Sequence, residues 1–81
     1  MNKKDLFIKK AKSLKSSVEP FLTDLDKIQA FACPETNAQC VWAWSQDALW
    51  FAERATDKWD KRTMEVKNAE RAFQHAFEYS R

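Results

Sequence analysis

Apolar residues recur every three or four positions through the first third of the chain. The stripe comprises Phe7, Ala11, Leu14, Val18, Phe21, Leu25, Ile28 and Ala32. Because steps of four and three alternate as in a heptad seam, the pattern predicts one helix over residues 3–32 that packs along another helix. Pro20 lies off the stripe and lacks an amide donor. We expect a bent helix there, with a restart capped by Ser16 or Ser17 as the alternative.

A second helix is predicted to begin at Thr36. Gln39 follows three residues later, which is the spacing of a capping box, and Pro34 discourages a helix from running through from the other side. The apolar residues that follow at helical spacing are Val41, Trp44, Ala48, Phe51 and Ala55. These positions form one amphipathic stripe, so this helix is expected to fold back antiparallel on the first.

The stripe continues beyond Ala55, but with a change of phase. Its later members are Trp59, Val66, Ala69, Phe73 and Phe77. Two consecutive steps of four around Ala55 are typical either of a stutter or of a helix end. We expect a continuous helix from Thr36 towards Tyr79, with a third helix starting near residues 57–61 as the alternative. The predicted fold class is therefore all-α, an antiparallel helical hairpin with a long second helix or a short third helix after about residue 57.

Trp42, Leu49 and Trp50 give the second helix another apolar surface outside the main stripe. A helix that is apolar on several sides is expected to be buried on more than one of them. One side packs within the protomer, and the other needs a second subunit, a partner or a flat ligand. We therefore predict a homo-oligomer. The expected interface residues are Trp42, Trp50, Phe73 and Phe77.

Length and composition agree with a single helical domain over residues 1–81. The chain has no glycine and only two prolines, whereas tight β-hairpins rely on glycine. It has neither an apolar run of about 18 residues nor an apolar core of signal-peptide length, so a cytoplasmic protein without membrane association is expected. In that compartment Cys33 and Cys40 are expected to remain reduced thiols.

The formal net charge of +2 is unevenly distributed along the chain. Residues 1–17 hold six lysines and one acid, Asp5, whereas residues 18–60 are acidic overall and residues 61–81 are weakly basic. A positive patch near the N-terminus fits phosphate groups, whether of nucleic acid or of a small nucleotide. A solvated lysine face that favours solubility accounts for the same charges equally well.

Catalysis is not indicated by the sequence. The one histidine, His75, has Glu78 one turn away, and a single pair of ligands is too few for a metal site. No spacing requires Cys33 or Cys40 to meet His75, and no glycine-rich phosphate loop occurs. We therefore expect no enzyme activity, no metal and no cofactor.

A short pattern in the middle of the chain consists of Cys33-Pro34, Thr36, Asp47-Ala48 and Trp50-Phe51-Ala52. It resembles the helical hairpin of small phage proteins that sequester cyclic oligonucleotide signals in anti-phage immunity, the anti-CBASS sponge family, with a related hairpin in anti-Thoeris sponges. In that family the run reads roughly Cys-Pro-x-Ser, followed by Glu-Ala-x-x-Trp-Ala and then by an arginine. In this chain Lys58 lies near the position of that arginine. The resemblance covers about residues 25–58.

The resemblance implies a compact homo-oligomer, a hexamer, that binds cyclic nucleotides between protomers without cleaving them. The candidate ligand-binding residues are Phe7, Lys9, Lys10, Arg54 and Lys58. The cationic side chains are expected to contact phosphates, and Phe7 to stack against a base.

Two functions from other classes remain open. A small helical inhibitor or antitoxin-like protein would bind a host protein through the face that carries Trp42 and Trp50. A weak nucleic-acid-binding protein would use residues 3–15, and its binding would depend strongly on salt.

Overall fold

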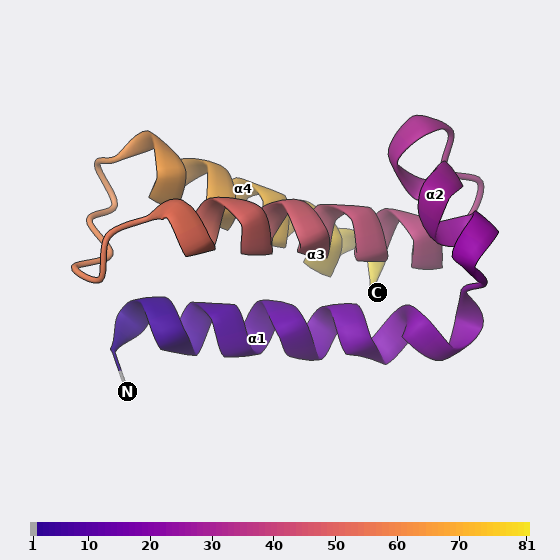
Figure 1. The fold of residues 1–81 in the computed structure, drawn as a ribbon, viewed down its shortest axis with the longest axis horizontal. Helices are drawn as coiled ribbons and strands as arrows, with labels where there is room; N and C mark the ends of the chain where they lie inside the picture. Colours follow the sequence, from indigo (N-terminus) through magenta and orange to yellow (C-terminus); the bar gives the residue numbers. More distant parts are fainter. Residues whose placement is uncertain (1) are drawn as a thin grey trace.

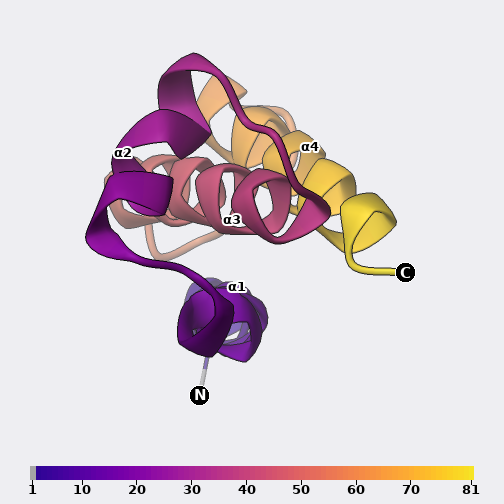
Figure 2. The ribbon, with the colours of Figure 1, turned by 90° about the vertical axis from the view of Figure 1, so that its right-hand side faces the viewer.

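The computed structural model describes residues 2–81, and within them the chain is helical without strands. Its elements are α1 (Lys3–Val18), the 3₁₀ turn η1 (Glu19–Phe21), α2 (Asp24–Ala32), α3 (Asn37–Arg54) and α4 (Met64–Tyr79). Figure 1 shows α1 and α3 side by side and running in opposite directions, with α4 returning along α3. Seen along these helices, α2 lies on one flank of α3 and α4 on the other (Figure 2). None of the helices in this range combines the length and the apolar character needed to cross a membrane.

The single helix predicted over residues 3–32 is wrong, because the chain breaks around Pro20. Helix α1 ends at Val18, η1 contains the proline, and Leu22 has extended backbone angles. The restart is capped by Thr23 rather than by Ser16 or Ser17. Thr23 and Asp26 form a complete capping box, which satisfies donors that a continuous helix would have paired internally.

This break turns the second half of the predicted seam towards solvent. Phe21, Leu25 and Ile28 are 75%, 62% and 70% exposed, and Phe31 beside them is 55% exposed. Within α2 only Ala30 is buried. The first half of the seam behaves as expected, since Ala11 is fully buried and Phe7 packs against both hydrophobic clusters of the core.

The predicted start of the second long helix is confirmed. Thr36 caps α3, and its capping box with Gln39 has both reciprocal hydrogen bonds. Gln39 is buried, and its side-chain amide also donates to the carbonyl of Asp26 at 3.1 Å. One side chain therefore starts α3 and attaches α2 to it.

The continuous helix predicted from Thr36 towards Tyr79 is also wrong. Helix α3 ends at Arg54 and α4 begins at Met64, so the third-helix alternative holds, with its start later than residues 57–61. Lys4 of α1 holds the end of α3, because its Nζ donates to the carbonyls of Glu53 at 3.3 Å and Ala55 at 2.9 Å. A cation at a helix C-terminus satisfies carbonyls that have no partner within the helix.

Helices α3 and α4 pack through small side chains. The buried alanines of the two helices are Ala48, Ala52, Ala69, Ala72 and Ala76. This alanine seam lets the helix backbones approach closely, and Val66 at 0% exposure closes one end of it. Helix α1 also packs along α3, and it has far fewer contacts with α4 than with α3. The space between α1 and α4 is therefore the most open part of the three-helix body.

Candidate functional site

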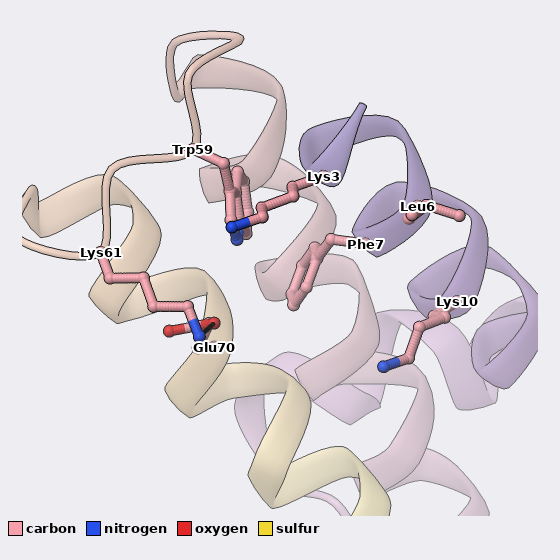
Figure 3. Close-up of a pocket in the computed structure, with 7 residues that line it drawn as sticks. All are labelled: Lys3, Leu6, Phe7, Lys10, Trp59, Lys61 and Glu70. Atoms are coloured by element: carbon pink, nitrogen blue, oxygen red, sulfur yellow. Dashed lines mark ion pairs between the residues drawn. The ribbon is translucent and has the colours of Figure 1, made fainter. Parts of the chain in front are cut away.

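A cavity of about 230 Å³ opens beside the first turns of α1. Its lining residues come from α1, α4 and the connection between α3 and α4: Lys3, Leu6, Phe7, Lys10, Trp59, Lys61 and Glu70. In Figure 3 the rings of Phe7 and Trp59 lie at its centre, and the side chains of Lys3, Lys10 and Lys61 surround them. We call this the lysine–aromatic cavity.

The aromatic wall of the cavity is built on Trp59. The centroids of the Trp59 and Phe7 rings are 4.9 Å apart, and Phe7 meets Phe73 of α4 edge-on at 5.6 Å. Trp59 is 5% exposed and has φ of 51°, a left-handed backbone that is unfavourable for a residue with a bulky side chain. Burial of the indole ring therefore holds the connection in a conformation that its backbone alone would disfavour.

The charges around the cavity are mainly positive. Lys61 pairs with Glu70 at 3.7 Å, and Lys10 Nζ lies 5.5 Å from the centroid of the Phe73 ring. Within residues 2–81 neither Lys3 nor Lys10 forms an ion pair. The site therefore offers two ammonium groups without carboxylate partners next to stacked aromatic rings.

Two of the five sequence-predicted ligand residues, Phe7 and Lys10, line this cavity. Lys9 is exposed on α1 outside the lining, and Lys58 is exposed in the connection between α3 and α4. Arg54 is engaged elsewhere, since its Nη1 donates to the Trp50 carbonyl at 2.9 Å and its guanidinium lies 3.6 Å from the Trp50 ring centroid.

Sequence reasoning missed four polar or aromatic members of the lining: Lys3, Trp59, Lys61 and Glu70. Lys3 belongs to the basic N-terminal segment, so the sequence shows its charge but not which side chains surround it in the fold. Trp59 had a signal in the phase shift of the stripe, which marks the position where the helix has ended. No signal in the sequence pointed to Lys61 and Glu70, because only the path of the connection between α3 and α4 brings them close to α1.

The predicted interface residues occupy different environments. Trp42 is half-buried, with Phe31 edge-on at 5.3 Å and Lys15 Nζ 5.2 Å from its ring centroid. Trp50 is 48% exposed beneath Arg54, and Phe73 is half-buried within the body. Phe77 is 43% exposed near the end of α4. The four side chains therefore do not form one continuous surface.

A second hollow, of about 340 Å³, lies between α1 and α4. It is lined by Lys10, Ser13, Leu14, Ser17, Phe73 and Phe77. We call it the α1–α4 groove. Lys10 lines both this groove and the lysine–aromatic cavity, so the two hollows adjoin each other.

A third hollow, of about 250 Å³, lies between α2 and α3 and has Cys40, Trp44 and Asp47 in its wall. Partial burial raises the pKa of Asp47. Trp44 also stacks on His75 of α4, with ring centroids 4.6 Å apart. Cys33 and Cys40 carry free thiols, and within residues 2–81 no cluster of three or more His, Cys, Asp or Glu side chains could hold a metal ion.

Replacing Asp47 with asparagine is expected to stabilise the protein near pH 7. The pKa of Asp47 is higher in the folded chain, so the wild type loses stability as pH rises from 3.8 through the folded pKa. Thermal unfolding of Asp47→Asn and wild type at pH 3 and pH 7 checks this, and the gain should appear only at the higher pH. An equal gain at both pH values would point to a cause other than ionisation.

Asp60 and Arg62 clamp the connection before α4. The Asp60 carboxylate accepts hydrogen bonds from the Arg62 backbone N–H at 2.9 Å and from Nε and Nη2 at 3.0 Å each. These side-chain bonds lower the pKa of Asp60 from 3.8 to about 2. The clamp therefore contributes stability above pH 3.8, and that contribution is lost as pH falls through 2.

An NMR titration of the Asp60 carboxyl is expected to give a pKa of about 2 in the wild type. Arg62→Ala should move that pKa back towards 3.8, because the guanidinium bonds are the largest cause of the shift. Lys61→Ala is the matched control, since it removes a neighbouring cation that does not bond to Asp60. An unchanged pKa in Arg62→Ala would contradict the clamp.

The site as a whole has the chemistry of binding. Its lysines can contact anionic oxygens, and its rings can stack against a planar group. In comparisons with protein-family models, with curated proteins and with solved structures, nothing matches the chain.

Proposed function

We propose that the protein is a non-enzymatic, phage-type counter-defence protein that binds cyclic oligonucleotide immune signals and sequesters them without cleavage. The observation that carries this proposal is the lysine–aromatic cavity. It places Lys3 and Lys10, which form no ion pair within residues 2–81, beside the ring pair of Phe7 and Trp59. The resemblance of residues 25–58 to the sponge hairpin supports the same ligand class.

A nucleotide carries the two groups that this cavity is suited to bind. Phosphate oxygens are attracted by ammonium groups, and a base can pack against the partly exposed ring of Phe7. Glu70 is the one carboxylate in the lining, and it pairs with Lys61. Hydrolysis would need a poised base or nucleophile, and a carboxylate engaged by a cation is poorly suited to either role.

The size of the cavity supports a shared site. Ligand pockets usually enclose about 300–1,000 Å³, whereas this one has about 230 Å³. A cyclic di- or trinucleotide would therefore extend beyond a single chain. We infer that a homo-oligomer covers the rest of the ligand, in agreement with the homo-oligomer predicted from the sequence.

A thermal-shift screen with cyclic di- and trinucleotides tests the proposal, followed by calorimetric titration of any ligand that binds. A hundredfold excess over the dissociation constant adds about 2.7 kcal/mol of stability. For a chain of this size that corresponds to a rise in Tm on the order of 10 °C. Chromatography of the released ligand should recover it intact.

The variant Lys10→Gln is expected to weaken ligand binding at least about tenfold, because one charge-assisted contact is worth about 1.5–3 kcal/mol. Lys12→Gln is the matched control, because this exposed lysine of α1 lies outside the lining. Equal loss in both variants would mean that only the general positive charge matters. No shift with any cyclic nucleotide would exclude the proposed function.

A protein inhibitor is the second candidate function, and the Trp50–Arg54 pair favours it. Tryptophan and arginine are the residues most enriched at energetic centres of interfaces, and here an exposed indole carries a stacked guanidinium. This function predicts a stable complex with a host protein that Trp50→Ala abolishes, and a Tm that cyclic nucleotides do not change.

A further inference from the structure

Exposed apolar side chains gather on α2 and on the turn η1 before it. They are Phe21 of η1 with Leu25, Ile28 and Phe31 of α2, and we call this set the α2 face. Phe31 also meets Trp42 edge-on, whereas the other three are more exposed. Leu25, Ile28 and Phe31 follow one another at steps of three within α2, so they lie along one side of a helix that can insert into a groove. A nine-residue helix is too short to be stable alone in water, and α2 contacts the body chiefly through α3.

The exposed apolar area of the α2 face is large enough for the centre of a protein–protein interface. With full side-chain areas of about 150–250 Å² for aromatic residues, the four exposed fractions amount to on the order of 400 Å². A stable interface buries about 800 Å² per partner, of which a little more than half is apolar. The α2 face with its polar surroundings therefore suffices for one side of such an interface.

The charges around the α2 face indicate what covers it. Residues 19–32 hold three carboxylates and one lysine, and Asp24 lies four residues before Ile28 on the same side of the helix. Pairing of two α2 faces would bring like charges together, which is unfavourable. Helix α1 is basic instead, and its Lys10 lines the α1–α4 groove, whereas Lys4 and Lys15 are bonded to groups of α3. An acidic, apolar helix thus matches a groove bordered by α1.

The α1–α4 groove has the complementary character. Leu14, Phe73 and Phe77 give it an apolar floor, and Lys10 stands in its wall. Figure 2 shows α2 on one flank of α3 and α4 on the other, so the face and the groove are different surfaces of one molecule. A contact between two different surfaces is heterologous, and it repeats from copy to copy into a ring or a filament.

We propose that the α2 face of one copy of this chain docks into the α1–α4 groove of a second copy. The interaction is helix-in-groove, with Ile28 near its centre and Asp24 towards the lysines of α1. Because the contact is head-to-tail, each copy uses its face for one neighbour and its groove for another. Added salt is expected to weaken the assembly, since part of the complementarity is electrostatic.

Sedimentation equilibrium without nucleotide tests this docking, with one variant for each surface. Ile28→Glu changes the α2 face and Phe77→Glu changes the groove, and both replace exposed side chains, so the fold should persist. Met64→Glu is the matched control, because Met64 is 62% exposed but belongs to neither surface. Circular dichroism verifies that all variants keep their helices.

Wild type and Met64→Glu are expected to gain mass with concentration, whereas Ile28→Glu and Phe77→Glu each remain monomeric. An equimolar mixture of the two monomeric variants should form heterodimers and nothing larger, since it retains one intact face and one intact groove. A mixture that stays monomeric would overturn the proposal. So would a Phe77→Glu variant that still forms dimers, because the α2 face would then pair with itself or with another surface. A wild type that is monomeric at every concentration would also overturn the docking, and it would mean that the α2 face binds a different protein.

The docking also bears on the ligand site, a step that rests on the proposed function. Since Lys10 lines both hollows, a docked α2 would lie next to the lysine–aromatic cavity and extend its wall. Ile28→Glu should therefore lower nucleotide affinity at least about tenfold, the size expected when a site loses one charge-assisted or well-packed contact. An assembled wild type that binds no cyclic nucleotide would overturn the function and leave the docking intact. Unchanged affinity in a monomeric Ile28→Glu would overturn only this coupling.

Discussion

Replacing Trp59 with alanine is expected to lower the free energy of unfolding by about 3–5 kcal/mol. The indole is 5% exposed, packs on Phe7 at 4.9 Å and belongs to the cluster that joins Ala55, Val66 and Ala69. Its loss would open a cavity and release the connection between α3 and α4. Because small domains have a stability of only about 5–15 kcal/mol, a large part of the total is at stake. Urea unfolding followed by circular dichroism measures the change.

Two further variants identify the cause of that loss. Trp50→Ala removes the same side chain from a site that is 48% exposed, so its effect should be much smaller. Trp59→Gly should be less damaging than Trp59→Ala by about 1–2 kcal/mol, because glycine tolerates the left-handed backbone. If glycine were the worse of the two replacements, the positive φ of 51° would not be a source of strain.

Replacing Ala69 with leucine is expected to destabilise the protein by about 1–3 kcal/mol, the range for overpacking a filled interior. Ala69 is fully buried in the alanine seam between α3 and α4, next to Ala52 and Val66. Three added carbons cannot be accommodated without separating the two helices. Chemical denaturation measures the loss, and the altered packing should also change the near-ultraviolet circular dichroism of the tryptophans.

Gln74→Leu on the exposed side of α4 is the matched control for this overpacking. It places the same new side chain on the same helix, and surface substitutions usually change stability by less than about 0.5 kcal/mol. A comparable loss in Gln74→Leu would mean that leucine harms α4 for a reason other than crowding in the seam.

The sequence predicts the start of α3 correctly because a capping box is local. Thr36 and Gln39 need only each other and the first turn, so their spacing is sufficient. The Pro20 region shows the opposite case. There the apolar seam is uninterrupted, yet a second capping box at Thr23 and Asp26 divides the helix. The capping signal was present in the sequence, and the regular seam concealed it.

The break near Trp59 depends on tertiary contacts that the pattern of residues does not contain. No glycine or proline marks the end of α3. Its last carbonyls are satisfied by Lys4, about 50 residues earlier in the chain, and the turn at Trp59 is held by its burial against Phe7. A signal of this kind appears only once α1 lies beside α3. For this reason the phase shift of the apolar stripe indicated where the helix is altered, but not whether the helix continues with a stutter or ends there.

The sequence identifies some residues of the candidate site but not its full membership. Clustered lysines near Phe7 predict an anion site, and of the predicted residues Phe7 and Lys10 line the cavity. Lys58 was proposed from its place in the sponge pattern, and it lies exposed outside the lining. Arg54 was predicted as a phosphate contact, but its stacking on Trp50 directs it elsewhere. The other members come together because the connection between α3 and α4 passes the N-terminus of α1, and neither periodicity nor charge determines that path.

The uneven contacts of α1, α3 and α4 also imply an order of folding. Helices α3 and α4 are neighbours in the chain and share the most contacts, whereas α1 reaches α3 across η1 and α2. Closing a short connection costs less entropy than closing a long one, so local pairs form early. The α3–α4 pair should therefore be the folding nucleus, and among the three long helices α1 should dock last and open first. Of these three, the N-terminal helix that carries most of the lysines would then be the one whose amides exchange fastest with solvent.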